Sequence, residues 1–378
     1  MIRLLQSTVV WIALFWSATG RLSPRAIRQG GEAMLLNSWA IALLVSAAAS
    51  LFLLGGAMRT AIRVLLSWAP EEDTATQIAL ENETWLAALL VRYGMVLQLA
   101  SLLLLVLAAD SFSHILIGAM CATGAFVANG YGMPALLVKL FGVFFYGFWL
   151  VLHRLDIRSE FLPLTRIKFA YLLLLGPLLV ADIGLLVLYL INLKPDIITS
   201  CCGVVFAAAG GEGRNLIGPL PIIHVMMLFY GIAGILLFLA FYLLRRHRKV
   251  EPTTHTRTPL VNLAFGLGCL MFFILSLVVI TAVISPYIYA LPSHRCPFDI
   301  LRGEYHGIGY PIYLSLMLAT FAGISSASTS FLQKLPGLTE PVRHFRQTCL
   351  RIFLFFLPVF ITLVTWFPAK YLIYGGEY

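Results

Sequence analysis

Hydrophobic residues form long unbroken runs along this chain and do not alternate with polar residues. Unbroken apolar runs of about 20 residues are typical of helices that cross a bilayer, whereas alternation is typical of membrane-spanning strands. The pattern predicts an all-α polytopic bundle of about nine transmembrane helices, or eight if the short third segment is re-entrant. We place the spans at 37–57, 85–108, 114–129, 135–152, 169–191, 217–244, 260–287, 308–332 and 350–369.

The segments between the spans are too short to form a separate soluble domain. We expect residues 1–36 to be a cytoplasmic N-terminal segment with an amphipathic helix at the interface. A single transmembrane helical domain over 37–369 and a short extracytoplasmic tail over 370–378 would follow. Residues 1–20 also have the pattern of a signal peptide, so two interpretations of that segment stay open. No internal repeat is evident in the sequence.

Composition supports the membrane class. Hydrophobic residues make up 60% of the chain, charged residues 11%, and the mean hydropathy is +0.91. A soluble domain carries about 25% charged residues. No nucleotide-binding glycine loop or metalloprotease motif is present in the sequence.

Lys and Arg gather in four segments, and nine spans place all four on the same side of the membrane. By the positive-inside rule that side is cytoplasmic. We therefore expect a bacterial inner-membrane protein with a cytoplasmic N-terminus and an extracytoplasmic C-terminus, and the net charge of +9 requires no nucleic-acid partner. The four segments are the N-terminal stretch with Arg3, Arg21, Arg25 and Arg28, "HRLDIRSEFLPLTRIK", "RRHRKVEPTTHTRT" and "QKLPGLTEPVRHFRQTCLR".

Three of the six cysteines fall in outward loops. Cys201 and Cys202 are adjacent in one loop, and Cys296 lies in the next, within "SHRCPFDILRGEYHGIGYP". A disulfide between Cys296 and one of the pair would suit an oxidising compartment, and the neighbouring thiol could attack that disulfide by exchange. His294 and His306 flank Cys296, and thiolates with imidazole suit a soft metal ion such as copper or zinc.

The cysteine loops therefore have three interpretations: a structural disulfide, thiol–disulfide exchange, or metal binding. The segment "CPFD" has the shape of a C-P-x-C redox motif with Asp299 at its last position, so a partner thiol has to come from the other loop. Positive charge from Arg295 and His294 would favour a thiolate at Cys296. Quinone or haem is less favoured as a cofactor, and whether the protein is an enzyme stays open.

Ionisable side chains also occur inside the predicted spans, where they usually pair or line a water-filled path. Such residues lie at a similar depth beneath the outer surface and predict an intramembrane polar layer. We expect either an ion pair between Arg92 and Asp182 or a proton or substrate path, and snorkelling of Lys139 towards the interface. The layer comprises Arg92, Cys121, Lys139, Asp182 and His224.

Two classes of function follow from these features. The first is a membrane protein whose outward cysteine and histidine loops handle thiol–disulfide electrons or a soft metal ion, with a thiol or metal carrier protein as partner. The second is a permease, or a non-catalytic subunit of a transporter or larger membrane complex, in which the cysteines are structural. The second class needs a partner such as an ATPase subunit, because the sequence has no nucleotide site.

Overall fold

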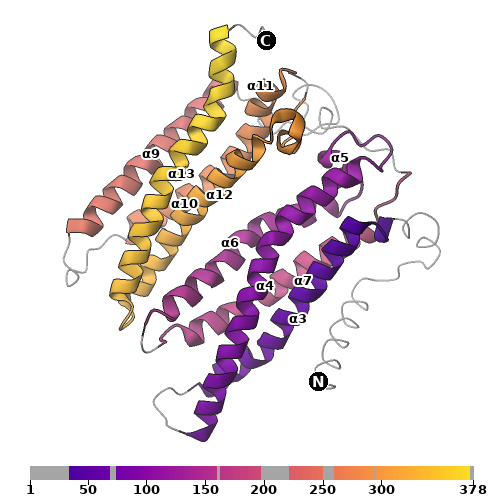
Figure 1. The fold of residues 1–378 in the computed structure, drawn as a ribbon. Coiled ribbons are helices and arrows are strands. Elements are labelled where there is room, and N and C mark those ends of the chain that lie inside the picture. The colour runs from indigo at the N-terminus through magenta and orange to yellow at the C-terminus, as the bar shows by residue number, and fades with distance from the viewer. Residues whose placement is uncertain are drawn as a thin grey trace. The chain divides into compact units, whose positions relative to one another are not determined.

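A computed structural model describes residues 34–68, 74–159, 162–196, 221–249, 259–292 and 294–374 (Figure 1). All regular structure in these residues is helical, which confirms the all-α fold class. Eight of the helices are long and apolar enough to cross a membrane. Two compact units divide the chain: residues up to 157 with 164–199, and residues 158–163 with 200–378.

The first unit contains four long helices. Helix α3 packs against α4 and α7, and α6 packs against the same two, so neighbours in the chain are neighbours in the bundle. Asn37 caps α3 by accepting the Trp39 N–H at 2.9 Å, and Thr74 caps α4 by accepting the Gln77 N–H at 3.3 Å. The helices are α3 (Ser38–Ser67), α4 (Ala75–Ser113), α6 (Gly132–Asp156) and α7 (Thr165–Ile191), with the short α5 (Ala122–Val127) between α4 and α6.

The core of the first unit lies where these four helices meet. Tyr146 and Trp149 of α6 are buried there with Val91 and Met95 of α4 and Leu172 of α7. Lipid tails are as apolar as these side chains, so close van der Waals packing stabilises the bundle more than removal of the side chains from water does.

The second unit repeats this arrangement. Helix α9 packs against α10 and α13, and α12 packs against the same two. Its core includes an aromatic group in which Phe229 stacks on Phe272 at 5.2 Å and meets Phe360 edge-on at 6.2 Å. The elements are α9 (Ile222–Lys249), α10 (Pro259–Val279), η1 (Ile280–Ile284), α11 (Ser285–Tyr289), η2 (Asp299–Leu301), η3 (Gly303–Tyr305), α12 (Gly309–Ser328), η4 (Thr329–Lys334) and α13 (Thr339–Tyr374).

The expected third span at 114–129 is not a transmembrane helix. The only helix in this segment is α5, whose six residues rise about 9 Å, far short of a hydrocarbon core of about 30 Å. Gly118 has a positive φ of 81°, and the Ile117 N–H donates to the Pro195 carbonyl at 3.2 Å, so the segment folds back as a connection. The part of the chain that the structure describes therefore has eight candidate spans, the lower of the two predicted numbers.

The two units share a sequence feature at the start of their third long helix. The first reads "GYGMPALL" from Gly130 and the second reads "GIGYPIYL" from Gly307, a common G-x-G-x-P-x-x-L pattern. A Cβ at Gly132 would lie 2.3 Å from the Phe126 carbonyl oxygen, and one at Gly309 would lie 2.9 Å from the Ile300 carbonyl oxygen. In both units this glycine lets the helix start directly against the connection that precedes it.

Small residues of α12 serve close helix packing. A Cβ at Gly323 would lie 2.5 Å from Cys269 Sγ on α10 and 3.1 Å from the Phe353 ring on α13. A Cβ at Gly266 of α10 would meet the Ala327 methyl group at 2.7 Å. The segment "FAGISSASTS" therefore brings three helices of the second unit together, as small residues do in membrane bundles.

Candidate functional site

The connection between α11 and α12, residues 290–308, contains Cys296 and begins with a distorted helix end. The turn Ile280–Ile284 is π-helical, and Pro286 follows it without a backbone N–H to donate. The Ser285 hydroxyl donates to the Thr281 carbonyl at 2.8 Å. Wide turns of this kind change the rotation of the helix that follows, and they are frequent at functional sites. Here the following helix, α11, ends at Tyr289.

Two tyrosines fix the backbone at Cys296. The Tyr289 hydroxyl donates to the Cys296 carbonyl at 2.5 Å, and the Tyr313 hydroxyl of α12 donates to the Pro297 carbonyl at 2.6 Å. The Tyr289 ring also meets the His294 ring edge-on at 4.4 Å. The cysteine is therefore held in place from both of the helices that the connection joins.

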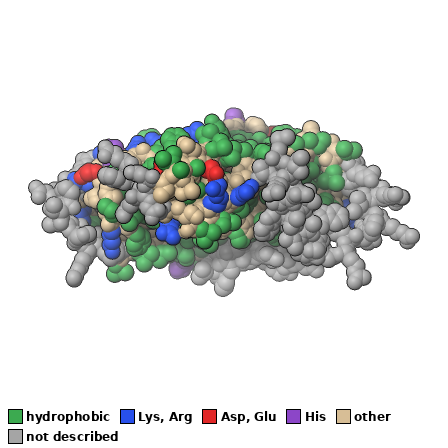
Figure 2. Space-filling view, turned by 90° about the horizontal axis from the view of Figure 1, so that it is seen from below, with side chains coloured by type: hydrophobic (Ala, Val, Ile, Leu, Met, Phe, Trp, Pro, Cys, Tyr) green, Lys and Arg blue, Asp and Glu red, His purple; other side chains and the backbone are tan. Residues whose placement is uncertain are grey.

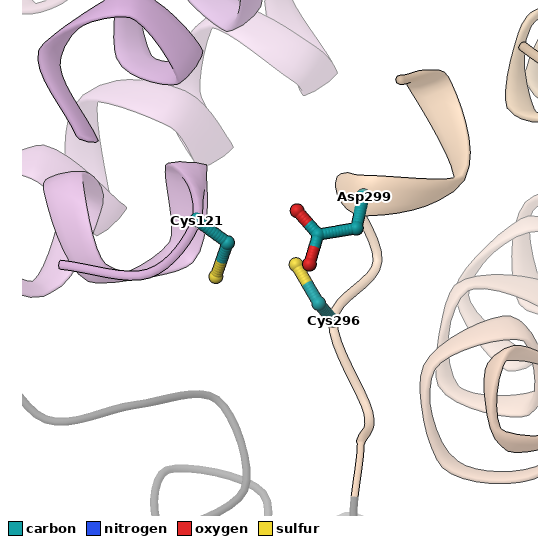
Figure 3. Close-up of side chains that lie close together, drawn as sticks. All are labelled: Cys121, Cys296 and Asp299. Atoms are coloured by element: carbon teal, nitrogen blue, oxygen red, sulfur yellow. The ribbon is translucent and has the colours of Figure 1, made fainter. Parts of the chain in front are cut away.

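The Cys296 thiol is fully buried beside a carboxylate. Its sulfur accepts the Phe298 N–H at 3.4 Å, and it lies within 4.8 Å of a carboxylate oxygen of Asp299. Figure 3 shows the Cys296 sulfur next to this carboxylate, which the short helix η2 presents. A sulfur that accepts a backbone N–H is better suited to the thiolate form, because the hydrogen bond favours the negative charge.

Asp299 is held by two further groups. His294 Nε2 lies 2.8 Å from Asp299 Oδ2, and Arg302 Nε lies 3.7 Å from Asp299 Oδ1. Burial, followed by the charges of Asp299 and Glu304, raises the pKa of the Tyr305 hydroxyl above its ordinary value. The positive charge of Arg302 acts on the Tyr305 pKa in the opposite direction.

The predicted cysteine and histidine residues are only partly brought together. His294 contacts the carboxylate of Asp299, whereas His306 is exposed at the end of η3, in the left-handed region with φ 55°. Cys201 and Cys202 lie outside the described residues, so their predicted bond or contact with Cys296 stays a prediction.

In the first unit, Lys139 and Asp182 form an ion pair. Lys139 Nζ is 2.9 Å from Asp182 Oδ1 and donates to Oδ2 at 3.0 Å, and both side chains are almost completely buried. Lys139 also donates to Ser101 Oγ at 3.0 Å and to Gln98 Oε1 at 3.5 Å. The Tyr146 hydroxyl donates to Asp182 Oδ2 at 3.4 Å. Every proton of the ammonium group thus has an acceptor, whereas Asp182 Oδ1 lies close to the ammonium group without a hydrogen bond of its own.

The other residues of the predicted polar layer do not join this pair. Arg92 was expected to bond Asp182, but its side chain is exposed and its guanidinium lies 5.2 Å from the centre of the Tyr93 ring. His224 is exposed in the first turn of α9. Cys121, which Figure 3 also labels, is buried at the N-terminus of α5 in the first unit.

The buried cation Arg346 of α13 lies in the second unit, and the sequence analysis missed it. It donates from Nε to the Ser326 carbonyl at 3.0 Å, from one terminal nitrogen to Asn262 Oδ1 at 2.8 Å and from the other to Gln333 Oε1 at 3.1 Å. These acceptors are neutral, and Ser326 belongs to the last turn of α12, where the helix dipole favours a cation. Arg346 therefore links the ends of three helices.

A second buried polar group, at the turn between α6 and α7, was also missed. Asp156 accepts the Leu164 N–H at 2.7 Å and the Thr165 hydroxyl at 3.0 Å, and it pairs with Lys168 Nζ at 2.5 Å. Sequence reasoning counted the basic residues of this turn only as topology signals. An acidic residue among them was the available sign of a buried pair.

Comparison with known proteins assigns no family, because no family model, curated protein or solved structure matches the chain. The fold defines the class, a polytopic all-helical membrane protein, and the chemistry of the site has to carry the rest.

Proposed function

We propose that this protein binds a metal ion of the zinc or copper(I) class at the Cys296 connection, on the extracytoplasmic face of a bacterial inner membrane. The observation that supports this function is the Cys296 thiol, within 4.8 Å of the Asp299 carboxylate in a backbone held by two tyrosines. Two anionic donors that close together repel each other unless a cation lies between them.

The same geometry favours metal binding over thiol–disulfide exchange. An attacking cysteine needs positive surroundings and access to its partner. Cys296 is fully buried, and the Asp299 carboxylate within 4.8 Å of its sulfur opposes formation of a bare thiolate. His294 orients this carboxylate through the 2.8 Å contact, as second-layer groups do around metal ligands.

The donor set indicates which ion is favoured. A thiolate with a carboxylate suits zinc, whereas copper(I) prefers sulfur ligands alone. We expect Cys201 and Cys202, which the structure does not describe, to supply further thiolates. If Cys201, Cys202 and Cys296 were all ligands, copper(I) would compete with zinc for the site.

Orientation follows from the order of the helices. The basic segments lie at the connections 157–164, 250–258 and 335–338 and in the helix ends that flank them. These connections alternate along the chain with the loops that contain Cys201, Cys202 and Cys296. If each long helix crosses once, the basic connections share one side and the cysteine loops the other. The start of α3 then lies on the cysteine side, so the predicted cytoplasmic N-terminus would require a further crossing before α3. The positive-inside rule then makes the cysteine side extracytoplasmic, where a metal carrier protein could deliver or accept the ion.

The proposal is tested by metal analysis of the purified protein and by titration of metal-free protein with cobalt(II). We expect about one bound ion per chain and a thiolate-to-cobalt absorption band, both lost in Cys296→Ser and weakened at least tenfold in Asp299→Asn. Cys349→Ala is the matched control, because Cys349 is a buried cysteine of the same unit far along the chain from the connection. Equal binding by wild type and Cys296→Ser would refute the proposal.

A second candidate function, transport through the first unit, rests on the Lys139–Asp182 pair. Ionisable residues buried in membrane helices mark ion and proton paths in many transporters. The chain would then act as a permease or membrane subunit with a separate energy-coupling partner such as an ATPase. If the double variant Lys139→Met with Asp182→Leu folds and keeps the full transport activity of the wild type in cells, the pair is not part of a transport path and this candidate is excluded.

A further inference from the structure

The exposed face of α4 carries an arginine within an apolar strip. The side chains around Arg92 on this face are apolar or aromatic and exposed: Trp85 by 74%, Leu89 by 41%, Tyr93 by 54% and Val96 by 50%. Figure 2 shows one face of the molecule, on which hydrophobic side chains lie between several separate groups of Lys and Arg. A face of this composition on a transmembrane helix is in contact with lipid.

The depth of Arg92 follows from the contacts of its neighbours. Ser101 of α4 lies level with Lys139 of α6, because their side chains are hydrogen-bonded. Arg92 lies nine residues, or about 13 Å, from Ser101 along α4, in the direction of the bundle end that contains Asp156. Asp156 is 17 residues, or about 25 Å, from Lys139 along α6. Its backbone is therefore about 12 Å below that end, within the apolar layer.

The direction of the side chain brings the charge towards the interface. Side chains of a helix tilt towards its N-terminus, and the N-terminus of α4 lies at the same end as Asp156. Trp85 lies about two turns farther in this direction, which is the headgroup level where tryptophan is enriched. The Arg92 side chain thus extends from the apolar layer towards the lipid headgroups.

Protein groups do not neutralise this arginine. The guanidinium of Arg92 lies over the Tyr93 ring at 5.2 Å, and among the described residues no carboxylate is within ion-pair distance of it. The nearby carboxylate of Asp156 is engaged by Lys168. The positive charges of Lys168 and Arg92 and the negative charge of Asp156 all act on the His153 ring.

We propose that Arg92, with Tyr93 and Trp85, binds the phosphate of a phospholipid headgroup on the leaflet next to the α6–α7 turn. A guanidinium presents two parallel N–H donors that match a phosphate, and the aromatic rings can contact the glycerol region of the lipid. The acyl chains would lie along the apolar strip of α4. By the orientation proposed above, this leaflet is the cytoplasmic one, which is rich in anionic lipid.

The test is titration of phosphatidylglycerol into the detergent-solubilised protein, with bound lipids counted by native mass spectrometry. We expect Arg92→Gln to weaken binding of the first lipid about tenfold, as for loss of one charge-assisted hydrogen-bond pair. Arg92→Lys, which keeps the charge but not the paired donors, should fall between wild type and Arg92→Gln. The matched control is Arg59→Gln, an exposed arginine on the neighbouring α3, which should bind as wild type does.

Two results would overturn this proposal. One is equal lipid affinity in wild type and Arg92→Gln, with circular dichroism showing both to be folded. The other is displacement of the lipid by inorganic phosphate alone, because that would identify a site for a free anion.

Discussion

Replacing Asp182 by asparagine tests whether the Lys139–Asp182 pair stabilises the first unit. The variant keeps the side-chain shape but leaves the Lys139 ammonium buried with neutral partners, among them Ser101 and Gln98, and without a counter-charge. At 2.9 Å and an effective dielectric constant of about 20, the lost Coulomb attraction is about 6 kcal/mol. Since part of this only offsets desolvation, we expect a loss of about 3–5 kcal/mol in the free energy of unfolding.

The double variant Lys139→Met with Asp182→Leu tests how much of the attraction between the two charges is offset by the cost of burying them. Two apolar side chains remove both charges, so neither is stranded, and the double variant should be more stable than either single variant. The measurement is unfolding of the four proteins by SDS in mixed micelles, followed by far-ultraviolet circular dichroism. A double-mutant cycle then gives the coupling energy, which should be several kcal/mol.

Arg92→Gln is the comparison variant, because the sequence predicted an ion pair between Arg92 and Asp182 from their similar depths in the spans. Its side chain is exposed, so the free energy of unfolding in lipid-free micelles should change by no more than about 0.5 kcal/mol. The reasoning would be refuted if Asp182→Asn cost less than 1 kcal/mol, or if the effects of Lys139→Met and Asp182→Leu simply added.

Three further predictions concern the rest of the chain. Single cysteines at Thr76 and Glu304, in a background without native cysteines, should react with an impermeant maleimide from opposite sides, whereas nine spans would put them on the same side. Gly309→Ala should destabilise the second unit by about 1–3 kcal/mol, because its Cβ would overlap Ile300, and an unchanged unfolding midpoint would contradict this contact. Arg346→Met should cost about 1–3 kcal/mol in the same assay, since Asn262 loses its buried partner, and wild-type stability would show that the link is dispensable.

The fold class was predictable because a bilayer imposes long apolar helices on any chain of this kind. The segment 114–129 was misjudged because its composition is apolar while its conformation depends on distant contacts. The Ile117 N–H bonds a carbonyl at Pro195, nearly 80 residues away, and no local pattern reveals such a partner. The one sign in the sequence was the length of this segment, which is shorter than that of the other predicted spans.

The buried pair was only half predictable. Hydropathy and helical rise placed Lys139 and Asp182 at a similar depth, but Arg92 satisfied the same criterion. That depth was wrong for Arg92, because α4 begins at Ala75 and not near residue 85. Arg92 lies about 13 Å along α4 from Ser101, which is level with Lys139, and its side chain faces outward. The exposed aromatic residues one and seven positions from Arg92, Tyr93 and Trp85, were the sign that it faces lipid.

At the candidate metal site, the cysteine was predictable and the carboxylate was overlooked. Asp299 entered the sequence analysis only as a departure from a redox motif. It stands three residues after Cys296, a spacing that one tight turn brings together, and η2 begins at this aspartate. Proximity of the two anions required that turn, which the segment "CPFD" does not specify by itself.

The matching order of helices in the two units has an evolutionary consequence. Each unit has four candidate spans, so a chain that enters a unit from one side of the membrane leaves it on that side. A gene for one such unit can therefore be fused in tandem to a second copy without inverting it, giving parallel copies. Gly132 and Gly309 would then descend from one ancestral glycine, and the ion pair in one copy and the phenylalanine cluster in the other would record how the two have diverged.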